Sequence, residues 1–327
     1  MLPLKIVSTS VAQASRLVSA ESIDEQLGFE PGYTFSKGGV RTRRFAAEGE
    51  LQSELAAKAL LGAMERAGLK NGRGLDLVIS ACGVQEQALP STGSAIVAAA
   101  GLTSSVPAFD VNASCISFVA ALRVAAGLLN TGGFSRIAIV AADLPSRGID
   151  WDEPEASLIF GDGAACAIVE RGDGSTGIEA YMLETYPEGR GYCEIRAGGT
   201  RRNPRTGVEP SDFLFKMDGR AVFRLAAKVL PMHLRSLTAM ARCQMSDIDV
   251  VVPHQASHLG MKHMSKKLGI PDERIVNIYE NHGNQVGASI PTALHAAFES
   301  GLAAPGKRAM LLGTAAGLTV GGLILRV

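Results

Sequence analysis

The sequence predicts an α/β fold made of two similar halves. Short runs rich in β-branched residues alternate along the 327-residue chain with longer segments of helical periodicity. The segment that begins at Ala56 resembles the one that begins at Ala226, since each is predicted as a helix, a polar turn and a strand with Asp near its start. A strand, a polar turn and a helix that starts with small residues follow from Val106, and again from Arg274. This repeated order of elements favours a duplicated α/β unit.

The first half shows the elements of this unit most clearly. Residues 51–67 carry apolar side chains at four-residue spacing, which predicts a helix that Gly68 ends. Residues 115–130 are apolar nearly all round, which predicts a helix in the middle of the protein. Strands buried on both faces, as in a parallel sheet, are predicted for residues 75–81, 108–111 and 136–142.

The length of the chain indicates how it is divided. A single hydrophobic core is near its limit at 327 residues, so two halves are expected. We predict an N-terminal half over residues 1–171 that carries a nucleophilic Cys, and a C-terminal half over residues 211–327 that carries a His and an Asn. Residues 172–210 are predicted to be an irregular connection.

Composition excludes several classes of protein. The chain has 32 basic and 32 acidic side chains, and this neutrality argues against a nucleic-acid partner. Residues 309–325 lack charges but are interrupted by glycines, so we predict two buried strands there and no membrane span. The first residues lack an apolar run long enough for a signal peptide. Five cysteines without a CxxC pair indicate reduced thiols and a cytoplasmic location.

One cysteine stands at a position suited to chemistry. Cys115 lies where a predicted strand gives way to the buried helix. At a helix N-terminus the dipole and the unpaired backbone N–H groups favour the thiolate, which is the reactive form. For an isolated cysteine, simple packing in the core would be the better interpretation.

Two further residues occupy matching places in the second half. His254 ends the predicted strand of DIDVVVPHQ, and Asn284 lies in the loop before the helix that mirrors the one after Cys115. Sites in open α/β sheets assemble at the carboxyl ends of strands and at helix N-termini. If a pseudo-twofold relates the halves, these loops face Cys115 and supply a nucleophile with two donors for a carbonyl or enolate oxygen.

Competing site types are poorly supported. His254 and His258 have helical spacing, but there is no HExxH motif and no evident third ligand, so no metal site is predicted. The glycine-containing segment that starts at Gly161 precedes a predicted strand, whereas a dinucleotide loop must open a helix. Walker A and GxSxG patterns are absent from the sequence.

Taken in order, seven segments of the chain resemble the β-ketoacyl-acyl-carrier-protein synthase III family of thiolase-fold condensing enzymes, over essentially the full length. The segments are GGVRTRRFA from Gly38, AFDVNASCISF around Cys115, LIFGDGAACAIV from Leu158, MDGRAVFRLAAKVLP from Met217, VVPHQAS around His254, HGNQVGASIPTAL around Asn284, and the C-terminal GTAAGLTVGGLILRV. The resemblance implies a thiolase-like fold, with duplicated βαβαβαββ halves in a five-layered α-β-α-β-α sandwich. It also implies a homodimer.

The same resemblance implies a role for each matching residue. Cys115 would accept an acyl group from an acyl-CoA or carrier-protein thioester, with the amides of Cys115 and Ala316 as oxyanion hole. His254 and Asn284 would bind the malonyl-carrier-protein carbonyl and stabilise the enolate left by decarboxylation. No metal and no redox cofactor would be needed.

Several positions that the family uses to bind CoA or its pantetheine arm carry different residues in this chain. Tyr33 and Pro154 occupy the places where acetyl-CoA-dependent members carry the Trp and Arg that hold adenine. Ser257 replaces the usual Asn of an HQAN motif, and the glycine triplet near the C-terminus has become residues 315–317, Ala-Ala-Gly. Leu89 stands where a bulky aromatic often closes the acyl tunnel, which predicts room for a longer acyl group. The CoA and pantetheine contacts are predicted at Tyr33, Lys37, Gly219 and Ser257.

An acidic carrier protein needs a local basic patch even when the net charge is zero. Arg224 matches a basic docking position of the family. Solvated helix faces are an equally good interpretation for the lysines of the predicted helix after His254. The docking candidates are Arg224, Lys262, Lys266 and Lys267.

The resulting prediction is a cytoplasmic condensing acyltransferase that initiates fatty-acid synthesis, with acyl carrier protein and acyl-CoA as partners. Specialised members stay open as alternatives, including synthesis of a biotin precursor and acyl transfer in secondary metabolism. For a dicarboxylyl primer, Arg147 could pair with the free carboxylate, although a structural ion pair is the simpler interpretation. A thioester-binding or thioester-hydrolysing relative is an alternative of another class.

Overall fold

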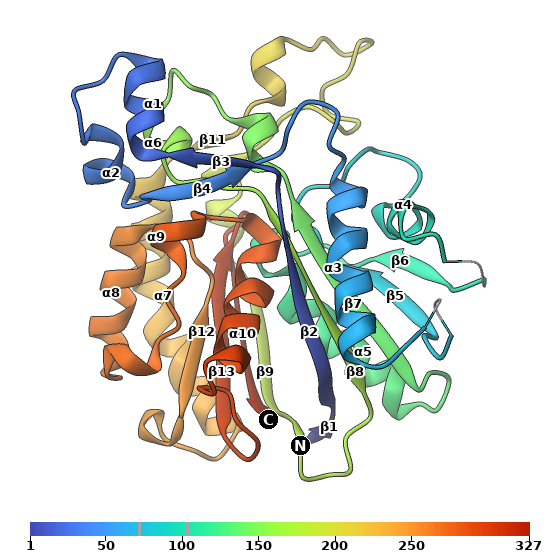
Figure 1. Ribbon diagram of the computed structural model, residues 1–327. Helices are drawn as coiled ribbons and strands as arrows, with labels where there is room; N and C mark the ends of the chain where they lie inside the picture. The colour runs from blue at the N-terminus through green and yellow to red at the C-terminus, as the bar shows by residue number, and fades with distance from the viewer. Residues whose placement is uncertain (71–72, 103–104) are drawn as a thin grey trace.

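The computed structural model describes residues 1–70, 73–102 and 105–327, except for the side chains of residues 267–268. It contains two five-stranded sheets, which we call the N-terminal and C-terminal sheets, and the ribbon in Figure 1 shows them side by side. The N-terminal sheet has the order β2-β8-β7-β5-β6, and the C-terminal sheet has the order β1-β9-β14-β13-β12. In the N-terminal sheet β5 runs parallel to β6 and β7, whereas β8 is antiparallel to β7 and β2.

The strands of the N-terminal sheet are β2 (Lys5–Gln13), β5 (Leu77–Ser80), β6 (Ala108–Asp110), β7 (Arg136–Asp143) and β8 (Gly163–Glu170). Those of the C-terminal sheet are β1 (Leu2–Pro3), β9 (Gly177–Thr185), β12 (Val250–Pro253), β13 (Arg308–Ala315) and β14 (Thr319–Arg326). Two small ribbons pair β3 (Arg16–Ser19) with β4 (Thr42–Phe45), and β10 (Cys193–Glu194) with β11 (Lys216–Met217).

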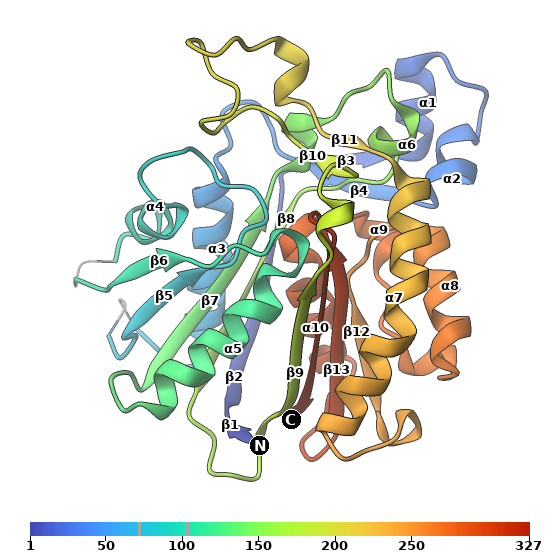
Figure 2. The same ribbon diagram turned by 180° about the vertical axis from the view of Figure 1, so that it is seen from behind.

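The helices form three layers around these sheets. Figures 1 and 2 show α3 (Gln52–Arg66) on the outer face of the N-terminal sheet and α7 (Gly219–Met240) on the outer face of the C-terminal sheet. Between the sheets lie α5 (Ser117–Asn130) and α10 (Ser289–Glu299), and they share one hydrophobic core with both sheets. The remaining helices are α1 (Ala20–Leu27), α2 (Tyr33–Gly38), α4 (Thr92–Ala99), α6 (Pro154–Ser157), α8 (His258–Leu268) and α9 (Tyr279–His282).

The prediction of a duplicated, five-layered α/β fold is confirmed, because helix and sheet layers alternate from α3 through to α7. The uncharged segment near the C-terminus forms the paired strands β13 and β14, as predicted. No helix in the described part of the chain combines the length and the apolar character that crossing a membrane requires.

Three details differ from the sequence-based expectation. Residues 172–210 are not irregular throughout, because they contain β9, a full member of the C-terminal sheet. The counterpart of β6 in the second half is a single bridge between Val251 and Ile275, and β1 supplies the fifth strand of that sheet instead. Strand β6 itself is an edge strand with Phe109 partly exposed, so it is not buried on both faces.

Candidate active site

Cys115 sits in a hydrogen-bonded turn that joins β6 to the central helix α5. The side-chain oxygen of Asn112 accepts a hydrogen bond of 2.9 Å from the N–H of Ser114, and Ser117 Oγ accepts one of 2.9 Å from the N–H of Ala113. Ser114 adopts φ +53°, a left-handed conformation that non-glycine residues rarely adopt. A short 3₁₀ turn, Ser114–Ile116, then leads into α5, so Cys115 lies in that turn and not in the α-helix itself.

Asn284 lies in a second turn with the same construction. Its side-chain oxygen accepts a hydrogen bond of 2.9 Å from the N–H of Val286, and Ser289 Oγ accepts one of 2.9 Å from the N–H of Gln285. Val286 adopts φ +51°, and a 3₁₀ turn over Val286–Ala288 leads into α10. Asn284 therefore corresponds to Asn112, and Gly287 corresponds to Cys115.

The surroundings of Cys115 combine poor solvation with hydrogen-bond donors. The side chain is half-buried, and loss of solvation raises the pKa of its thiol to about 11. Ser114 Oγ lies 3.8 Å from the sulfur, and the backbone N–H groups of Cys115 and Ala316 also point to the sulfur, which lowers the pKa in part. The expected lowering of the thiol pKa is therefore wrong for the resting protein, because desolvation outweighs the helix terminus and the amides.

His254 follows the last residue of β12 and is buried. Its backbone N–H donates a 2.8 Å hydrogen bond to the carbonyl of Leu312 on the neighbouring strand. Burial lowers the pKa of the imidazole to about 4, so the ring is neutral at physiological pH and carries a single N–H. Among the described residues Nδ1 has no hydrogen-bond partner, which fits a tautomer with the proton on Nε2.

Gly313 lets strand β13 pass close to His254 and to the turn that carries Cys115. A Cβ atom at Gly313 would lie 2.9 Å from the Cβ of His254 and 2.8 Å from a methyl group of Ile116. A larger residue at this place would push His254 away from the turn that carries Cys115.

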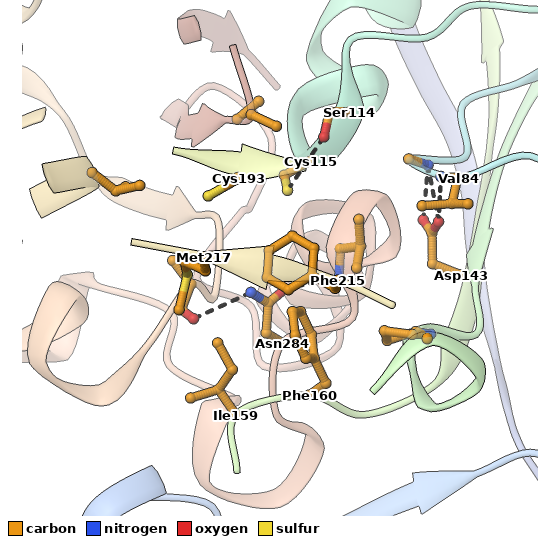
Figure 3. Close-up of a pocket in the computed structure, with 18 of the residues that line it drawn as sticks. Val84, Ser114, Cys115, Asp143, Ile159, Phe160, Cys193, Phe215, Met217 and Asn284 are labelled. Atoms are coloured by element: carbon orange, nitrogen blue, oxygen red, sulfur yellow. Dashed lines mark hydrogen bonds between the residues drawn. The ribbon is translucent and has the colours of Figure 1, made fainter. Parts of the chain in front are cut away.

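The three predicted catalytic residues line one large cavity, of about 2310 Å³. In Figure 3, Cys115 and Asn284 project toward the same space, with Phe215 near both. The Nδ2 group of Asn284 donates a 3.2 Å hydrogen bond to the carbonyl of Ala256, which orients the amide. The cavity wall near these polar groups is apolar and is formed by Ile159, Phe160, Cys193, Phe215 and Met217.

The predicted CoA and pantetheine contacts, Tyr33, Lys37, Gly219 and Ser257, all line this cavity. Lys37 Nζ lies 5.9 Å from the centre of the Tyr33 ring. The hydroxyl of Ser257 caps α8, since it accepts a 3.1 Å hydrogen bond from the N–H of Gly260. Pro154 lines the cavity as well.

The docking candidates lie along the cavity wall formed by α7 and α8. Arg224, Lys262 and Lys266 line the cavity, and both lysines are exposed. The side chain of Lys267 falls outside the described residues.

Leu89, predicted to lie at the acyl tunnel, does not line the cavity of the single chain. This side chain is 85% exposed, and the cavity is lined by the preceding residue, Ala88. The reason is a surface turn in which the side-chain amide of Gln87 donates a 2.6 Å hydrogen bond to the Leu89 carbonyl.

Arg147 lines the cavity but has no carboxylate partner among the described residues. Its guanidinium donates a 2.7 Å hydrogen bond to the carbonyl of Ala47 and a longer one to that of Glu50. The ion-pair interpretation is therefore wrong, since the hydrogen bonds of this side chain go to backbone oxygens.

Sequence reasoning missed the aromatic part of the wall and one buried carboxylate. Phe160 and Phe215 meet edge to face, with their ring centres 5.2 Å apart. Asp143 is buried and ends β7, and strand ends are where sites assemble in such sheets, so this signal was available in the sequence. Nothing in the sequence pointed to Cys193, the first residue of β10.

No cluster of three or more His, Cys, Asp or Glu side chains suited to a metal ion occurs among the residues that the structure describes.

Comparison with known proteins gives a consistent result. Residues 109–187 match the family model for 3-oxoacyl-[acyl-carrier-protein] synthase III, and residues 238–327 match the model for its C-terminal part. A β-ketoacyl-[acyl-carrier-protein] synthase III of Laribacter hongkongensis is 36% identical over 290 residues, or 89% of this chain and 88% of the relative. The protein of that name from Neisseria meningitidis is 30% identical over 98% of both chains. The crystal structure of synthase III from Pseudomonas aeruginosa superposes with a TM-score of 0.88, at 28% identity over 99% of this chain and 98% of that one.

Proposed function

Because the chain belongs to the 3-oxoacyl-[acyl-carrier-protein] synthase III family, we propose that it joins an acyl thioester to malonyl-acyl carrier protein and so initiates fatty-acid synthesis. The observation that supports this most strongly is the meeting of Cys115, His254 and Asn284 in one cavity, on turns from both halves. The reaction releases CO₂ and leaves a β-ketoacyl thioester on the carrier protein.

In the first half-reaction the sulfur of Cys115 attacks the carbonyl carbon of the acyl thioester. A new C–S bond forms, the bond to the donor sulfur breaks, and the proton of Cys115 leaves with the donor thiol. The N–H groups of Cys115 and Ala316 hold the negative oxygen of the tetrahedral intermediate, since both already point to this sulfur. The thiolate forms only during the attack, so the reaction is compatible with a resting thiol whose pKa is about 11.

In the second half-reaction malonyl-carrier protein enters, and its thioester carbonyl accepts hydrogen bonds from His254 and Asn284. The carboxylate leaves as CO₂, and its electron pair forms an enolate whose oxygen these two donors stabilise. The carbanion attacks the acyl carbon, the bond to Cys115 breaks, and the sulfur takes up one proton. A neutral His254 suits this role because its N–H donates without first needing protonation.

The mouth of the cavity supports a carrier-protein partner. Arg224, Lys262 and Lys266 lie on α7 and α8 and line the cavity, and carrier proteins are acidic. We propose that Tyr33, Lys37, Gly219 and Ser257 contact the pantetheine arm of either donor. These steps use only side chains, backbone amides and two thioesters, so we propose no metal or redox cofactor.

A homodimer fits the outer edge of the N-terminal sheet. Strand β6 is the edge strand there, and Phe109 on it is partly exposed. An edge that carries apolar side chains favours pairing with a second copy. Analytical ultracentrifugation at micromolar concentration should give the mass of a dimer, and a monomer at all concentrations would refute this part of the proposal.

The function is tested by intact-protein mass spectrometry with acetyl, medium-chain and glutaryl donors on CoA and on carrier protein. We expect one adduct of the mass of the preferred acyl group, absent from Cys115→Ser, and its conversion to a β-ketoacyl product when malonyl-carrier protein is added. An adduct that turns over without the malonyl substrate would indicate a thioesterase. No adduct from any donor would refute the proposed function.

A further inference from the structure

Asp143 makes a set of contacts that reaches from one half of the molecule into the other. It is the last residue of β7 and is buried, 1% exposed. One carboxylate oxygen accepts hydrogen bonds from the N–H groups of Gly83, at 3.0 Å, and Val84, at 2.8 Å. The other accepts from Gly83 at 2.9 Å and from Gly287 at 3.0 Å. Figure 3 shows Asp143 and Val84 with hydrogen bonds between them, beside the space into which Cys115 projects.

The donors belong to different halves. Gly83 and Val84 follow β5 in the N-terminal sheet, whereas Gly287 belongs to the 3₁₀ turn that starts two residues after Asn284. Gly287 also corresponds to Cys115 in the matching turn. The backbone N–H that points to the reactive sulfur in one half is thus bound to a carboxylate in the other.

Backbone hydrogen bonds and close packing also hold this turn against the first half: the N–H of Asn284 donates 2.7 Å to the carbonyl of Ile159, and its carbonyl accepts 3.1 Å from the N–H of Gly161. A Cβ atom at Gly287 would lie 2.9 Å from the carbonyl of Ala81, from Asp143 Oδ2 and from the N–H of Gly83. The turn of Asn284 therefore rests directly on the backbone that follows β5.

We propose that Asp143 is a positioning residue for the decarboxylating half-reaction, because its carboxylate ties the Asn284 turn to the half that carries Cys115. The inference rests on the proposed function and adds a residue to it. Asn284 must face a carbonyl that stands within bonding reach of the acyl group on Cys115, so the distance between the two turns matters. A displacement of about 1 Å in such a geometry costs on the order of 100-fold in rate.

The charge of Asp143 gives a second, separate readout. Burial raises the pKa of this carboxyl to about 7, although its three N–H donors oppose the rise. The titratable groups that act on it or feel its charge are Cys82, Cys115 and Asp162. Since its negative charge raises the pKa of Cys115, removing the charge should make that thiol ionise at lower pH.

The test uses Asp143→Asn, which has nearly the same shape but turns an N–H group toward the backbone donors. We expect condensation to fall about 100-fold through kcat, with KM for malonyl-carrier protein little changed, while acylation of Cys115 stays within about threefold. The pH profile of alkylation by iodoacetamide should shift to lower pH. Equal loss in both half-reactions, or an unshifted alkylation profile, would overturn the proposal.

Asp162→Asn is the matched control. Asp162 is also buried, and its carboxylate accepts from the N–H groups of Ala46, at 2.7 Å, and Ser146, at 2.9 Å, which belong to the first half. A general effect of losing a buried carboxylate would give this variant the same selective loss of condensation, and that result would also overturn the proposal.

Hydrogen exchange separates this inference from the proposed function, because it needs no turnover. Peptides that cover residues 284–289 should exchange on the order of tenfold faster in Asp143→Asn than in the wild type and in Asp162→Asn. If the wild-type protein has no condensing activity, the proposed function is refuted, and the exchange result still tests whether Asp143 holds the Asn284 turn. Unchanged exchange in Asp143→Asn would show that Asp143 does not hold the Asn284 turn, whatever the activity.

Discussion

The turns that carry Cys115 and Asn284 have the same backbone conformation but present different functional groups. Both begin with an asparagine whose oxygen accepts a 2.9 Å hydrogen bond from the residue two positions on. Both asparagines also donate a 3.2 Å hydrogen bond to a backbone carbonyl, of Gly83 in the first half and of Ala256 in the second. The first turn offers a thiol, whereas the second offers only the amide side chain of Asn284.

The strand ends next to these turns diverge in the same way. Ala81 and His254 hold matching places, since each N–H donates to the neighbouring strand, at 2.7 Å and 2.8 Å. The strands β7 and β13 have equal length and end at Asp143 and Ala315. Duplication thus supplied the frame, and exchanges of side chain at equivalent positions divided the chemistry between the halves.

The largest effect is expected when the thiol is removed, because only the first of the two turns carries a nucleophile. In Cys115→Ala we expect no acyl adduct and a loss of condensation on the order of 10⁴-fold, because no nucleophile remains to carry the acyl group. Decarboxylation of malonyl-carrier protein should continue, since its donors lie in the other half. Release of CO₂ and intact-protein mass measure the two parts separately. Complete acylation of another cysteine in this variant, such as Cys193, would contradict the role of Cys115 as the nucleophile.

The next test compares the paired asparagines. Asn284→Ala should lower decarboxylation by about 100- to 1000-fold, as expected when a donor to a developing oxyanion is lost, and leave acylation of Cys115 nearly intact. Asn112→Ala removes the matching turn contact in the first half and is the control. We expect it to slow acylation less than tenfold without affecting CO₂ release. Equal losses of CO₂ release in the two variants would mean that Asn284 serves only the turn.

A third test addresses packing between the halves. Gly287→Ala places a methyl group against three backbone or carboxylate atoms at 2.9 Å, so we expect the free energy of unfolding to fall by about 2–3 kcal/mol. Gly191→Ala is a suitable control, because a methyl group there meets no atom within 4 Å. Urea unfolding of both variants measures the difference, and similar midpoints would show that the turns do not press on each other.

The smallest effect concerns pH and the His254 side chain, which has no counterpart at Ala81. The pKa of its imidazole is about 4 in the folded protein and 6.5 for an ordinary histidine, so the unfolded chain binds the proton more tightly. The neutral His254 side chain therefore costs stability as pH falls from about 6.5 toward 4. The free energy of unfolding lost in this way is about 2 kcal/mol at pH 5. The difference in unfolding free energy between wild type and His254→Gln should shrink or reverse by that amount between pH 7 and pH 5. A constant difference would refute the pKa assignment.

The sequence was a good guide to the order of elements and to the residues that line the site. Apolar side chains at four-residue spacing predicted the helix over residues 51–67, because burial on one face leaves a helical period. A continuous apolar run predicted strand β5, because burial on both faces leaves no polar positions. The repeat located Cys115 and Asn284 at equivalent turns, since the same backbone needs small and polar residues at the same places.

Other features depend on contacts between distant residues and left no local pattern. The pKa of Cys115 follows from desolvation by the surrounding wall, which no spacing around Cys115 records. The exposure of Leu89 follows from a surface turn, and the hydrogen bond from Gly287 to Asp143 joins residues 144 positions apart. Strand β9 was missed because it lies in a segment whose charges and glycines resemble those of a loop.

The first residues of the chain have a consequence for how the molecule folds. Leu2 and Pro3 pair with Ile178 and Gly177 in the C-terminal sheet, whereas β2, which begins at Lys5, belongs to the N-terminal sheet. Such pairings have high contact order, and they cannot form on a growing chain until half of it has been made. We therefore expect the two halves to unfold in one cooperative transition, with fluorescence and circular dichroism giving the same midpoint. Two separate transitions would show instead that this short strand does not couple the halves.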